Sequence, residues 1–452
     1  MFKLSHYLVI TEPVAAGKRV LFATRTARTL VITDTLYDKL QRGAWDEISD
    51  RVFDKLRTIE AIVPAAEREV HTIIARNKAT VADGTSLYHV IQPTAMCQLG
   101  CGYCGQKHTK DYIGTAHSDL VLERIASKFS AKPYRHVEIA WFGSEPLMGW
   151  VQIRSLTPRI QALARERGCT YSAKLVTNGL SLKVPIFLEL VQQHGVKSIE
   201  VTLDGTAEHH DARRHTKDGL STFKLIFQNL LAIYNLPNFK ELGCDISIRC
   251  NVDERNSESV IPLLHLLAEH ELQDKIAYFY VAPIHAWGNE AHLLSLEKQA
   301  FGEQEITWMI EMIRLGFTPR LLPSLNPVVC MSVTPDAEVF DAFGNVFDCT
   351  EVPYVESYDN TEYILGNVGN GLDTISTHRP LLSFHDDVAD GKYPCTTCRM
   401  LPVCGGGCPK SWREGMPPCP SNKFNIESKL MLHYALHRQG KEEFVAILNQ
   451  TA

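Results

Sequence analysis

The stretch that most constrains this chain is Cys97-Gln-Leu-Gly-Cys101-Gly-Tyr-Cys104, where three cysteines are spaced Cys-x3-Cys-x2-Cys directly after the apolar run 87–91. A [4Fe–4S] cluster normally takes four thiolates, one for each iron. A loop with three thiolates leaves one iron open to a substrate or cofactor, whereas a structural zinc site fills all its positions. The spacing therefore predicts an open-iron cluster. An incomplete zinc site and three unrelated cysteines are the alternatives.

Composition limits the remaining possibilities. The 452 residues exceed one ordinary hydrophobic core, so two or three domains are expected. The net charge of -6 gives no reason to expect nucleic-acid binding. No apolar run reaches the roughly 18 residues of a membrane span, and the N-terminus lacks the layout of a secretory signal. We therefore predict a cytoplasmic protein with no nucleic-acid or membrane partner, in which most of the 13 cysteines are metal or cluster ligands rather than members of disulfides.

Residues 1–85 are predicted to form a separate small module. Three short β-rich runs come first, at 7–10, 19–24 and 29–33. Helices are then expected at 34–43, 46–59 and 65–78. Asp34 is the expected N-cap of the first helix, and Gly43 is its expected end.

Residues 86–300 alternate strand and helix patterns. Strands are expected at 87–93, 136–142, 172–177, 198–203, 245–251 and 275–282. Helical patterns fill the gaps, for example at 151–166, 184–194 and 257–271. Repeated β-α units predict an α/β fold with parallel strands, and enzymes of this kind build their sites at the carboxyl ends of the strands.

Polar, glycine-containing motifs follow three of these strands. They are Gly143-Ser-Glu-Pro146, Thr177-Asn-Gly179, and Thr202-Leu-Asp-Gly205 with its continuation His210-Asp-Ala-Arg-Arg214. Each motif alone is a common turn. Their order and their placement after the cysteine loop predict one shared site. Arg249 and Asn251, at the end of the fifth strand, are lesser candidates for site residues. For the charged Arg249, the alternative is an ion-paired residue at the rim of the sheet.

Residues 301–452 hold a second group of seven cysteines. They are Cys330, Cys349, Cys395, Cys398, Cys404, Cys408 and Cys419. The pairs Cys-x2-Cys and Cys-x3-Cys would also suit zinc, but one zinc ion would leave several of these thiols without a role. Cys169, Cys244 and Cys250 fit neither pattern and are predicted to be buried core thiols.

With Tyr103 before its last cysteine, the 97–104 loop resembles the signature loop of radical S-adenosylmethionine (SAM) enzymes, and the resemblance extends from residue 87 to about 425. It implies a partial (β/α)6 TIM-like barrel at 86–300. The cysteine-rich region 301–452 resembles the SPASM extension of that superfamily, which carries auxiliary clusters. The module at 1–85 resembles the winged-helix domains that bind leader peptides, with a plain packing extension as the alternative.

The resemblance also implies residue roles. Cys97, Cys101 and Cys104 would hold the catalytic cluster, whose open iron chelates the amino and carboxylate groups of SAM. Tyr103 and Gly143 would lie at the SAM site, and Glu145 would accept hydrogens from the SAM amino group. The remaining contacts implied for SAM or the substrate are Asn178, Thr202 and Arg214, of which Arg214 would pair with the methionine carboxylate.

Two auxiliary [4Fe–4S] clusters are implied as well, which makes three in total. Cys395, Cys398, Cys404 and Cys419 would complete one of them. Cys330, Cys349 and Cys408 would hold the other, and residues 321–329 contain no eighth cysteine. One iron of that cluster is therefore predicted to be open or to have a ligand other than cysteine.

The implied activity is that of a radical SAM oxidoreductase acting on a peptide. One hypothesis is a maturase that installs a thioether or carbon–carbon crosslink in a ribosomally made precursor, which is guided by its leader. The alternative is a sulfatase-type maturase that forms formylglycine, but that family has Asp directly after the Cys349 position, where this chain has Thr350 and then Glu351. A low-potential donor such as flavodoxin or ferredoxin is the expected electron source. A non-catalytic peptide-binding iron–sulfur or zinc protein is the alternative from another class.

Overall fold

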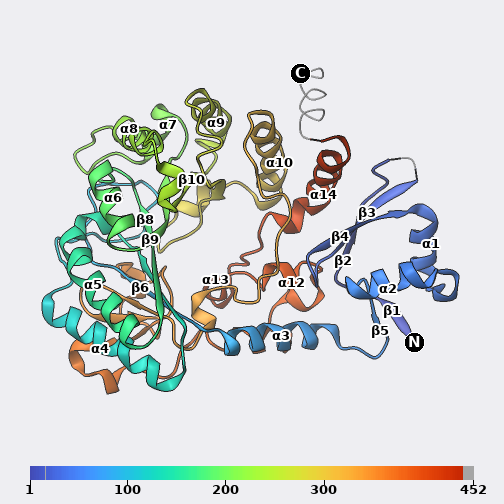
Figure 1. The fold of residues 1–452 in the computed structure, drawn as a ribbon, viewed down its shortest axis with the longest axis horizontal. Helices are drawn as coiled ribbons and strands as arrows, with labels where there is room; N and C mark the ends of the chain where they lie inside the picture. Colours follow the sequence, from blue (N-terminus) through green and yellow to red (C-terminus); the bar gives the residue numbers. More distant parts are fainter. Residues whose placement is uncertain (16, 441–452) are drawn as a thin grey trace.

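A nine-stranded sheet is the centre of the computed structural model, which describes residues 1–15 and 17–440 (Figure 1). Six of its strands are parallel and follow one another in chain order. They are β6 (Ser86–Ile91), β7 (His136–Trp141), β8 (Thr170–Thr177), β9 (Val196–Thr202), β10 (Asp245–Val252) and β11 (Tyr278–Pro283). All six strands expected from the sequence are confirmed.

Helices cover the outer side of these strands, as the arc of ribbons in Figure 1 shows. They are α4 (Thr115–Ala131), α5 (Trp150–Glu166), α6 (Val184–Gln192), α7 (Ala207–Arg213), α8 (Phe223–Tyr234), α9 (Val260–Glu269) and α10 (Lys298–Arg314). Along β7, β8, β9 and β10, buried residues alternate with partly exposed ones, so mainly one face of these strands is buried. In β10, for example, Ile246, Ile248 and Cys250 are all 0% exposed.

The C-terminal region adds three strands to the same sheet. Strand β12 (Glu338–Phe340) pairs in parallel with β6, and the antiparallel strands β13 (Asn345–Phe347) and β14 (Ile364–Asn367) follow. These three additional strands were not predicted, because strands of three or four residues show no clear hydrophobic periodicity in the sequence. Strand β12 covers the edge that β6 would otherwise expose.

A buried ion-pair group joins β12 to the helix layer. The carboxylate of Glu338 lies 2.7 Å from Arg124 and 2.8 Å from Lys128, both on α4. Burial opposes the charge of this carboxylate, but the hydrogen bond from Arg124 and the charge of Lys128 outweigh burial and lower the pKa of Glu338 to about 2. The ionised carboxylate of Glu338 therefore holds β12 against α4.

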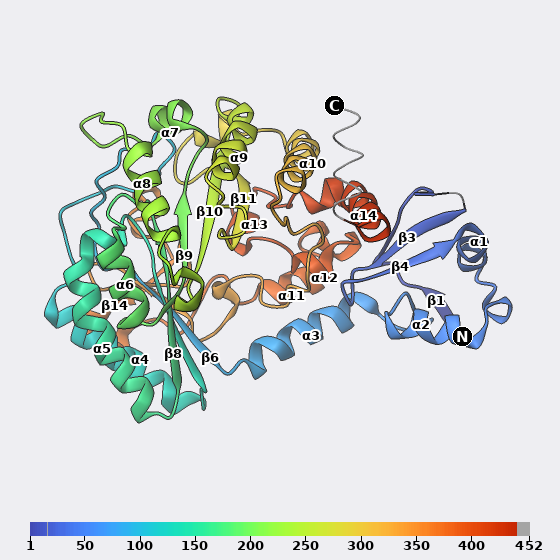
Figure 2. The same ribbon diagram turned by 45° about the horizontal axis from the view of Figure 1, so that its top comes forward.

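The N-terminal module contains the three predicted strands and three predicted helices, together with two short strands, β1 and β5, that were not predicted, and β5 lies between the second and third helices (Figure 2). Its elements are β1 (Phe2–Leu4), β2 (Leu8–Ile10), β3 (Lys18–Ala23), β4 (Arg28–Thr33), α1 (Asp34–Arg42), α2 (Asp50–Thr58), β5 (Ile62–Pro64) and α3 (Glu69–Asp83). Strands β2, β3 and β4 form one antiparallel sheet, and β1 pairs with β5. The N-cap prediction for α1 was wrong by one residue. The cap is Thr33, whose side chain accepts from the Leu36 amide, while Asp34 pairs with Arg19.

A buried arginine anchors the module to α3. Arg25 is 1% exposed in its side chain and lies 2.6 Å from Glu60, 2.7 Å from Glu67 and 3.0 Å from Glu69 at the start of α3. Figure 2 shows α3 running from this module toward β6. Three carboxylates around one guanidinium make the desolvated charge tolerable. The module is thus held to its connecting helix by more than apolar packing.

The cysteine-rich C-terminal region contains short helices and one long one. They are α11 (Phe384–Ala389), α12 (Leu401–Cys404), α13 (Pro409–Arg413) and α14 (Asn422–Gln439). Helix α14 packs on α10, where Leu432 contacts Met309 and Ile313 in one apolar cluster. The predicted core thiols are buried, with Cys169 8%, Cys244 5% and Cys250 0% exposed. No helix of the described residues is long and apolar enough to cross a membrane.

Candidate functional site

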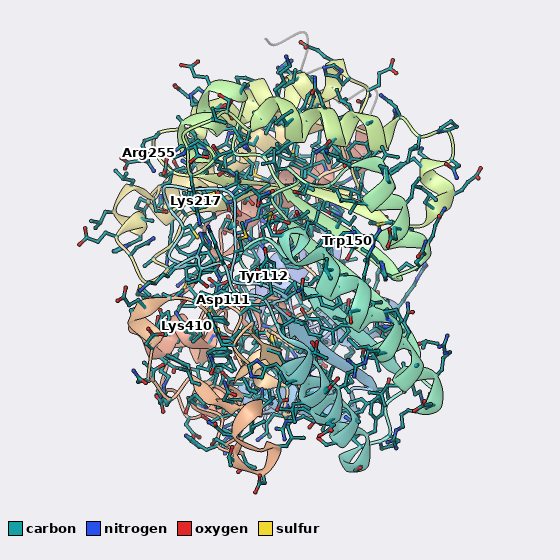
Figure 3. The ribbon with its side chains drawn as sticks, turned by 90° about the vertical axis from the view of Figure 1, so that its left-hand side faces the viewer. Asp111, Tyr112, Trp150, Lys217, Arg255 and Lys410 are labelled. Atoms are coloured by element: carbon teal, nitrogen blue, oxygen red, sulfur yellow. The ribbon has the colours of Figure 1, made fainter. Side chains whose placement is uncertain are left out.

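The cysteine loop follows β6, and hydrogen bonds to main-chain carbonyls hold its two ends in place. The Thr94 hydroxyl donates to the Asp111 carbonyl at 2.7 Å, and the Ala95 amide donates to the same carbonyl at 3.0 Å. Farther along, the Gly100 amide donates to the carbonyl of His215 at 2.9 Å. Figure 3 shows Asp111 and Lys217, which mark these two anchoring segments, on the same face of the molecule. The loop shape is therefore fixed by the fold.

The loop forms one wall of a cavity of about 170 Å³ at the carboxyl ends of the strands. The predicted site residues that line this cavity are Cys97, Cys101, Tyr103, Cys104, Gly143, Asn178, Thr202 and Arg214. The two lesser candidates, Arg249 and Asn251, line it as well. The motifs that are separate in sequence thus meet in one place, as expected for strand-end motifs in a parallel sheet.

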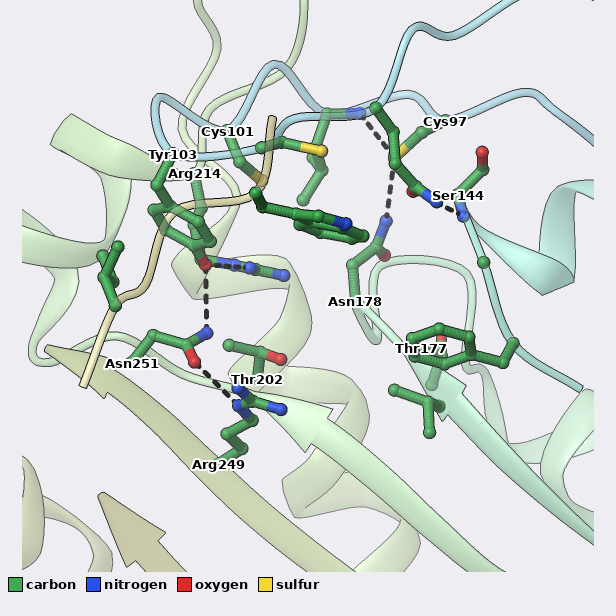
Figure 4. Close-up of a pocket in the computed structure, with 18 of the residues that line it drawn as sticks. Cys97, Cys101, Tyr103, Ser144, Thr177, Asn178, Thr202, Arg214, Arg249 and Asn251 are labelled. Atoms are coloured by element: carbon green, nitrogen blue, oxygen red, sulfur yellow. Dashed lines mark hydrogen bonds between the residues drawn. The ribbon is translucent and has the colours of Figure 1, made fainter. Parts of the chain in front are cut away.

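Tyr103 is the centre of a buried polar network (Figure 4). Its hydroxyl donates to the Asp204 carboxylate at 2.6 Å and accepts from the side chains of Asn251, at 3.2 Å, and Arg214. Burial, opposed by the charge of Arg214, raises the pKa of the Tyr103 phenol well above its ordinary value. Tyr103 therefore stays protonated and orients Arg214 at the cavity wall. Asp204 is fully buried, and its only signal in the sequence was the Leu-Asp-Gly turn.

Glu145 is not among the residues that line the cavity. Its fully buried carboxylate accepts from the Thr177 hydroxyl at 2.7 Å, the Asn178 amide at 2.7 Å and the Leu147 amide at 3.0 Å. Burial nevertheless raises the pKa of Glu145 above its ordinary value. The carboxylate joins the turns after β7 and β8, and its contact with SAM stays a prediction.

The turn before Glu145 explains the glycine there. Gly143 has a φ of +85°, and a Cβ on it would lie 2.3 Å from the side chain of Gln92. Ser144, where the related motif has a second glycine, also has a positive φ of 48°, and its amide donates to Gln106 at 3.0 Å. The replacement therefore keeps the turn and adds modest backbone strain.

The three loop thiols fit an iron–sulfur cluster. Burial raises the pKa of Cys97 to about 12 and that of Cys104 to about 11, and burial also raises the pKa of Cys101. Such thiols ionise at neutral pH only beside a strong positive charge, and metal coordination supplies it. Cys97 already has two nearby donors, the Leu99 amide at 3.4 Å and the Asn178 side-chain amide at 3.9 Å.

A second group of thiols consists of Cys330, Cys349 and Cys408. Burial raises the pKa of Cys349 well above its ordinary value, and the neighbouring Glu351, Cys330 and Cys408 raise it further, so these groups lie close together. Cys250, which is 0% exposed inside β10, is not one of this group: burial raises the pKa of its thiol, and the neighbouring charge of Asp204 raises it further. Glu351 also lines the cavity of the first group, so it lies between the two sites.

The third group surrounds its own small pocket. Cys395, Cys398, Cys404 and Cys419 all line it. In residues 1–15 and 17–440, no three His, Cys, Asp or Glu side chains are arranged to hold a single metal ion. The seven C-terminal thiols thus divide into the three and four that the resemblance implied, and their cluster ligation stays a prediction.

The N-terminal module contacts the loop that carries the third group. The Thr24 hydroxyl lies 2.7 Å from the Arg399 carbonyl, and the Tyr7 hydroxyl donates to the Thr396 carbonyl at 3.1 Å. A shared apolar cluster packs beside these bonds, with Val9, Val20 and Phe22 of the module against Met400, Val403, Ile426 and Leu430. This interface between the N-terminal module and the C-terminal region was not predicted, because no sequence motif identifies either surface.

The segment after β11 also lines the main cavity, and this was not predicted from the sequence. Trp287 donates through its indole to the Glu351 carbonyl at 2.7 Å, and His285 lies 3.3 Å from the Glu351 carboxylate. The Asn289 side chain donates to the Tyr103 carbonyl at 3.1 Å. These residues follow β11 in a segment without glycine-rich or paired-ligand spacing, so no sequence signal indicated them.

Comparison with known proteins agrees with this arrangement. Residues 91–236 match the radical SAM superfamily. A serine-type anaerobic sulfatase-maturating enzyme of Bacteroides thetaiotaomicron is 25% identical over 358 residues, which cover 72% of this chain and 83% of that enzyme.

Solved structures show a similar fold. The structure titled native anSMEcpe with bound AdoMet has a TM-score of 0.55 at 17% identity, covering 81% of this chain and 100% of that chain. Native anSMEcpe with bound AdoMet and Kp18Cys peptide has a TM-score of 0.56 at 18% identity, covering 81% of this chain and 99% of that chain.

Proposed function

We propose that this chain is a radical SAM enzyme, related in sequence to the anaerobic sulfatase-maturating enzymes, that modifies a side chain of a ribosomally made peptide by radical chemistry. The observation that carries the proposal is the meeting of the cysteine loop and the strand-end motifs around one cavity. Trp287, which follows β11, and Glu351 of the C-terminal region line the same cavity. A peptide loop is a substrate that can reach such a recessed site.

Cys97, Cys101 and Cys104 are the residues that would hold the cluster. When bound, a cluster of this kind supplies the electron that cleaves SAM to the 5′-deoxyadenosyl radical. The chain itself contributes orientation and shielding from water. Arg214, held by Tyr103, is placed to pair with a carboxylate. The Thr202 hydroxyl on the same wall offers a hydrogen bond to the ligand.

The reaction that we favour is formation of a crosslink, either a thioether or a carbon–carbon bond. Two features support it over formylglycine formation: Thr350 directly after Cys349, and an N-terminal module with a strand edge. The alignment with anSMEcpe leaves about a fifth of this chain uncovered, which agrees with an additional module.

Formylglycine formation stays a second candidate because of one specific observation. Glu351 lines the cavity, where its pKa is lowered: burial opposes its charge, but the hydrogen bond from His285 and the charges of His285, Arg249 and Lys410 together outweigh burial. A carboxylate is therefore present beside the substrate space even though Thr350 occupies the usual position. Several sequence relatives are also named serine-type anaerobic sulfatase-maturating enzymes.

The N-terminal module is proposed to bind the leader of the precursor. Among the described strands, β4 pairs only with β3 and so ends its sheet. An extended peptide can add to such an edge through main-chain hydrogen bonds. Val31 on β4 is 47% exposed and offers an apolar contact beside the edge. The opposite side of the module is occupied by the C-terminal region.

Co-expression with a short peptide encoded beside the gene, followed by mass spectrometry, tests the proposal. A crosslink removes two hydrogens from the peptide, and so does oxidation of serine to formylglycine. Tandem fragmentation and labelling with an aldehyde-reactive hydrazide separate the two products. A modified peptide without an aldehyde supports the crosslink, and an aldehyde supports the second candidate. An unmodified peptide with fully loaded enzyme, which requires about twelve irons for three clusters, contradicts both for that peptide.

A further inference from the structure

Asn178 lies where the turn after β8 meets the cysteine loop, as Figure 4 shows. Its side-chain nitrogen is 3.9 Å from the Cys97 sulfur, within the range of an N–H···S hydrogen bond. Both residues are buried, Asn178 at 6% and Cys97 at 7% exposure. Asn178 was expected to contact SAM or the substrate, so this contact with a predicted cluster ligand is a different role for it.

The orientation of the Asn178 amide follows from its other partner. Its Oδ1 accepts from the Leu180 main-chain amide at 2.9 Å. Because a main-chain N–H can only donate, the oxygen must face Leu180, and the NH₂ group must then face Cys97. The direction of the bond to sulfur is therefore fixed by an independent hydrogen bond.

The turn that carries Asn178 is held from two sides. The Asn178 main-chain amide donates to Glu145 at 2.7 Å. On the other side, the Asn229 side chain of α8 lies 3.1 Å from the carbonyl of Gly179 and 3.0 Å from that of Leu180. Gly179 itself has a φ of +80°, and a Cβ there would lie 2.8 Å from Val201. The donor is thus preorganised rather than free to rotate away.

A hydrogen bond to a cluster sulfur favours the more negative, reduced state. Hydrogen bonds to the sulfurs are among the factors that set iron–sulfur potentials, and partners outside the ligand set tune metal sites generally. We propose that Asn178 raises the reduction potential of the cluster held by Cys97 through this N–H···S bond, so that a donor of low potential can reduce it. The inference rests on the proposed cluster and adds a tuning residue to it.

The test is a redox titration of Asn178→Leu, followed by electron paramagnetic resonance and carried out without SAM. Leucine has a similar size and removes the donor. We expect its reduced signal to appear at a more negative potential than in the wild-type protein. Asn229→Leu is the matched control, because it loosens the same turn without removing a donor to sulfur. We expect its midpoint potential to shift much less than that of Asn178→Leu, because the donor to sulfur is still present.

Several outcomes would overturn the inference. A wild-type potential in Asn178→Leu with full iron content would do so, and so would an equal shift in Asn229→Leu. Should Asn178→Leu not assemble the cluster, the wild-type protein with ¹⁵N-labelled asparagine side chains gives the answer: the reduced cluster should show a hyperfine coupling to ¹⁵N, and its absence refutes the bond. A wild-type protein that forms no cluster at all would instead contradict the proposed function.

Discussion

The contact between Thr24 and the loop of the third thiol group allows a quantitative prediction. The Thr24 side chain is fully buried, and its hydroxyl lies 2.7 Å from the Arg399 carbonyl, within the segment that carries Cys395, Cys398 and Cys404. Thr24→Val keeps the shape and removes the donor. Loss of one hydrogen bond costs about 0.5–1.5 kcal/mol, which corresponds to about a 2- to 13-fold larger equilibrium constant for local opening.

The assay is the rate at which a chelator removes iron from the anaerobic, reconstituted protein. We expect the fraction of iron at the third thiol group to leave faster in Thr24→Val, by a factor within that range. Thr26→Val is the matched control, because the Thr26 hydroxyl donates to the Ile59 carbonyl at 2.9 Å inside the module. Equal release rates in the two variants would refute the idea that the module holds this loop in place.

The remaining predictions concern the site, the leader surface and acid stability. Tyr103→Phe should weaken SAM binding about tenfold or more, because hydrogen bonds to charged groups contribute about 1.5–3 kcal/mol; equilibrium dialysis at unchanged iron content measures this, and an unchanged Kd contradicts it. Val31→Lys should raise the apparent KM for a full precursor but not for a leaderless core peptide, whereas Val151→Lys, at a 71% exposed position on α5, should change neither; equal kinetics in both variants would leave the module a packing extension. The pKa of Glu338 is lowered from 4.5 to about 2, so its ion pairs contribute stability above pH 4.5 that is lost as the pH falls toward 2; urea midpoints should fall over this window in the wild-type protein and less steeply in Glu338→Gln, and parallel slopes would count against the ion pair.

Much of the main site could be predicted because its residues follow strands that are recognisable from the sequence. Each apolar run long enough to be a buried strand was found, and the carboxyl ends of parallel strands necessarily meet at one edge. Thr202 and Arg214 were therefore expected near the cysteine loop, and both line its cavity. The sequence pattern predicts where these residues lie because the same β-α unit repeats along the chain.

Other features depend on contacts that no local pattern encodes. Strand β12 is three residues long, and it forms because β6 offers an edge and α4 offers Arg124 to Glu338. Asn178 was expected to contact SAM or the substrate, and its contact with Cys97 depends on the main-chain amide of Leu180, which fixes the orientation of its side chain. In both cases, residues far apart in the chain decide the outcome, so propensity and spacing could not reveal it.

Cleavage of SAM by the loop of Cys97, Cys101 and Cys104 is the central claim, and one measurement tests it most directly. The reconstituted protein is incubated anaerobically with SAM and dithionite, and 5′-deoxyadenosine is quantified by liquid chromatography. We predict its formation by the wild-type protein and its loss in the triple variant with these three cysteines changed to alanine, while C-terminal iron is retained. Continued formation in the triple variant, or none in a wild-type protein with full iron content, would contradict the account.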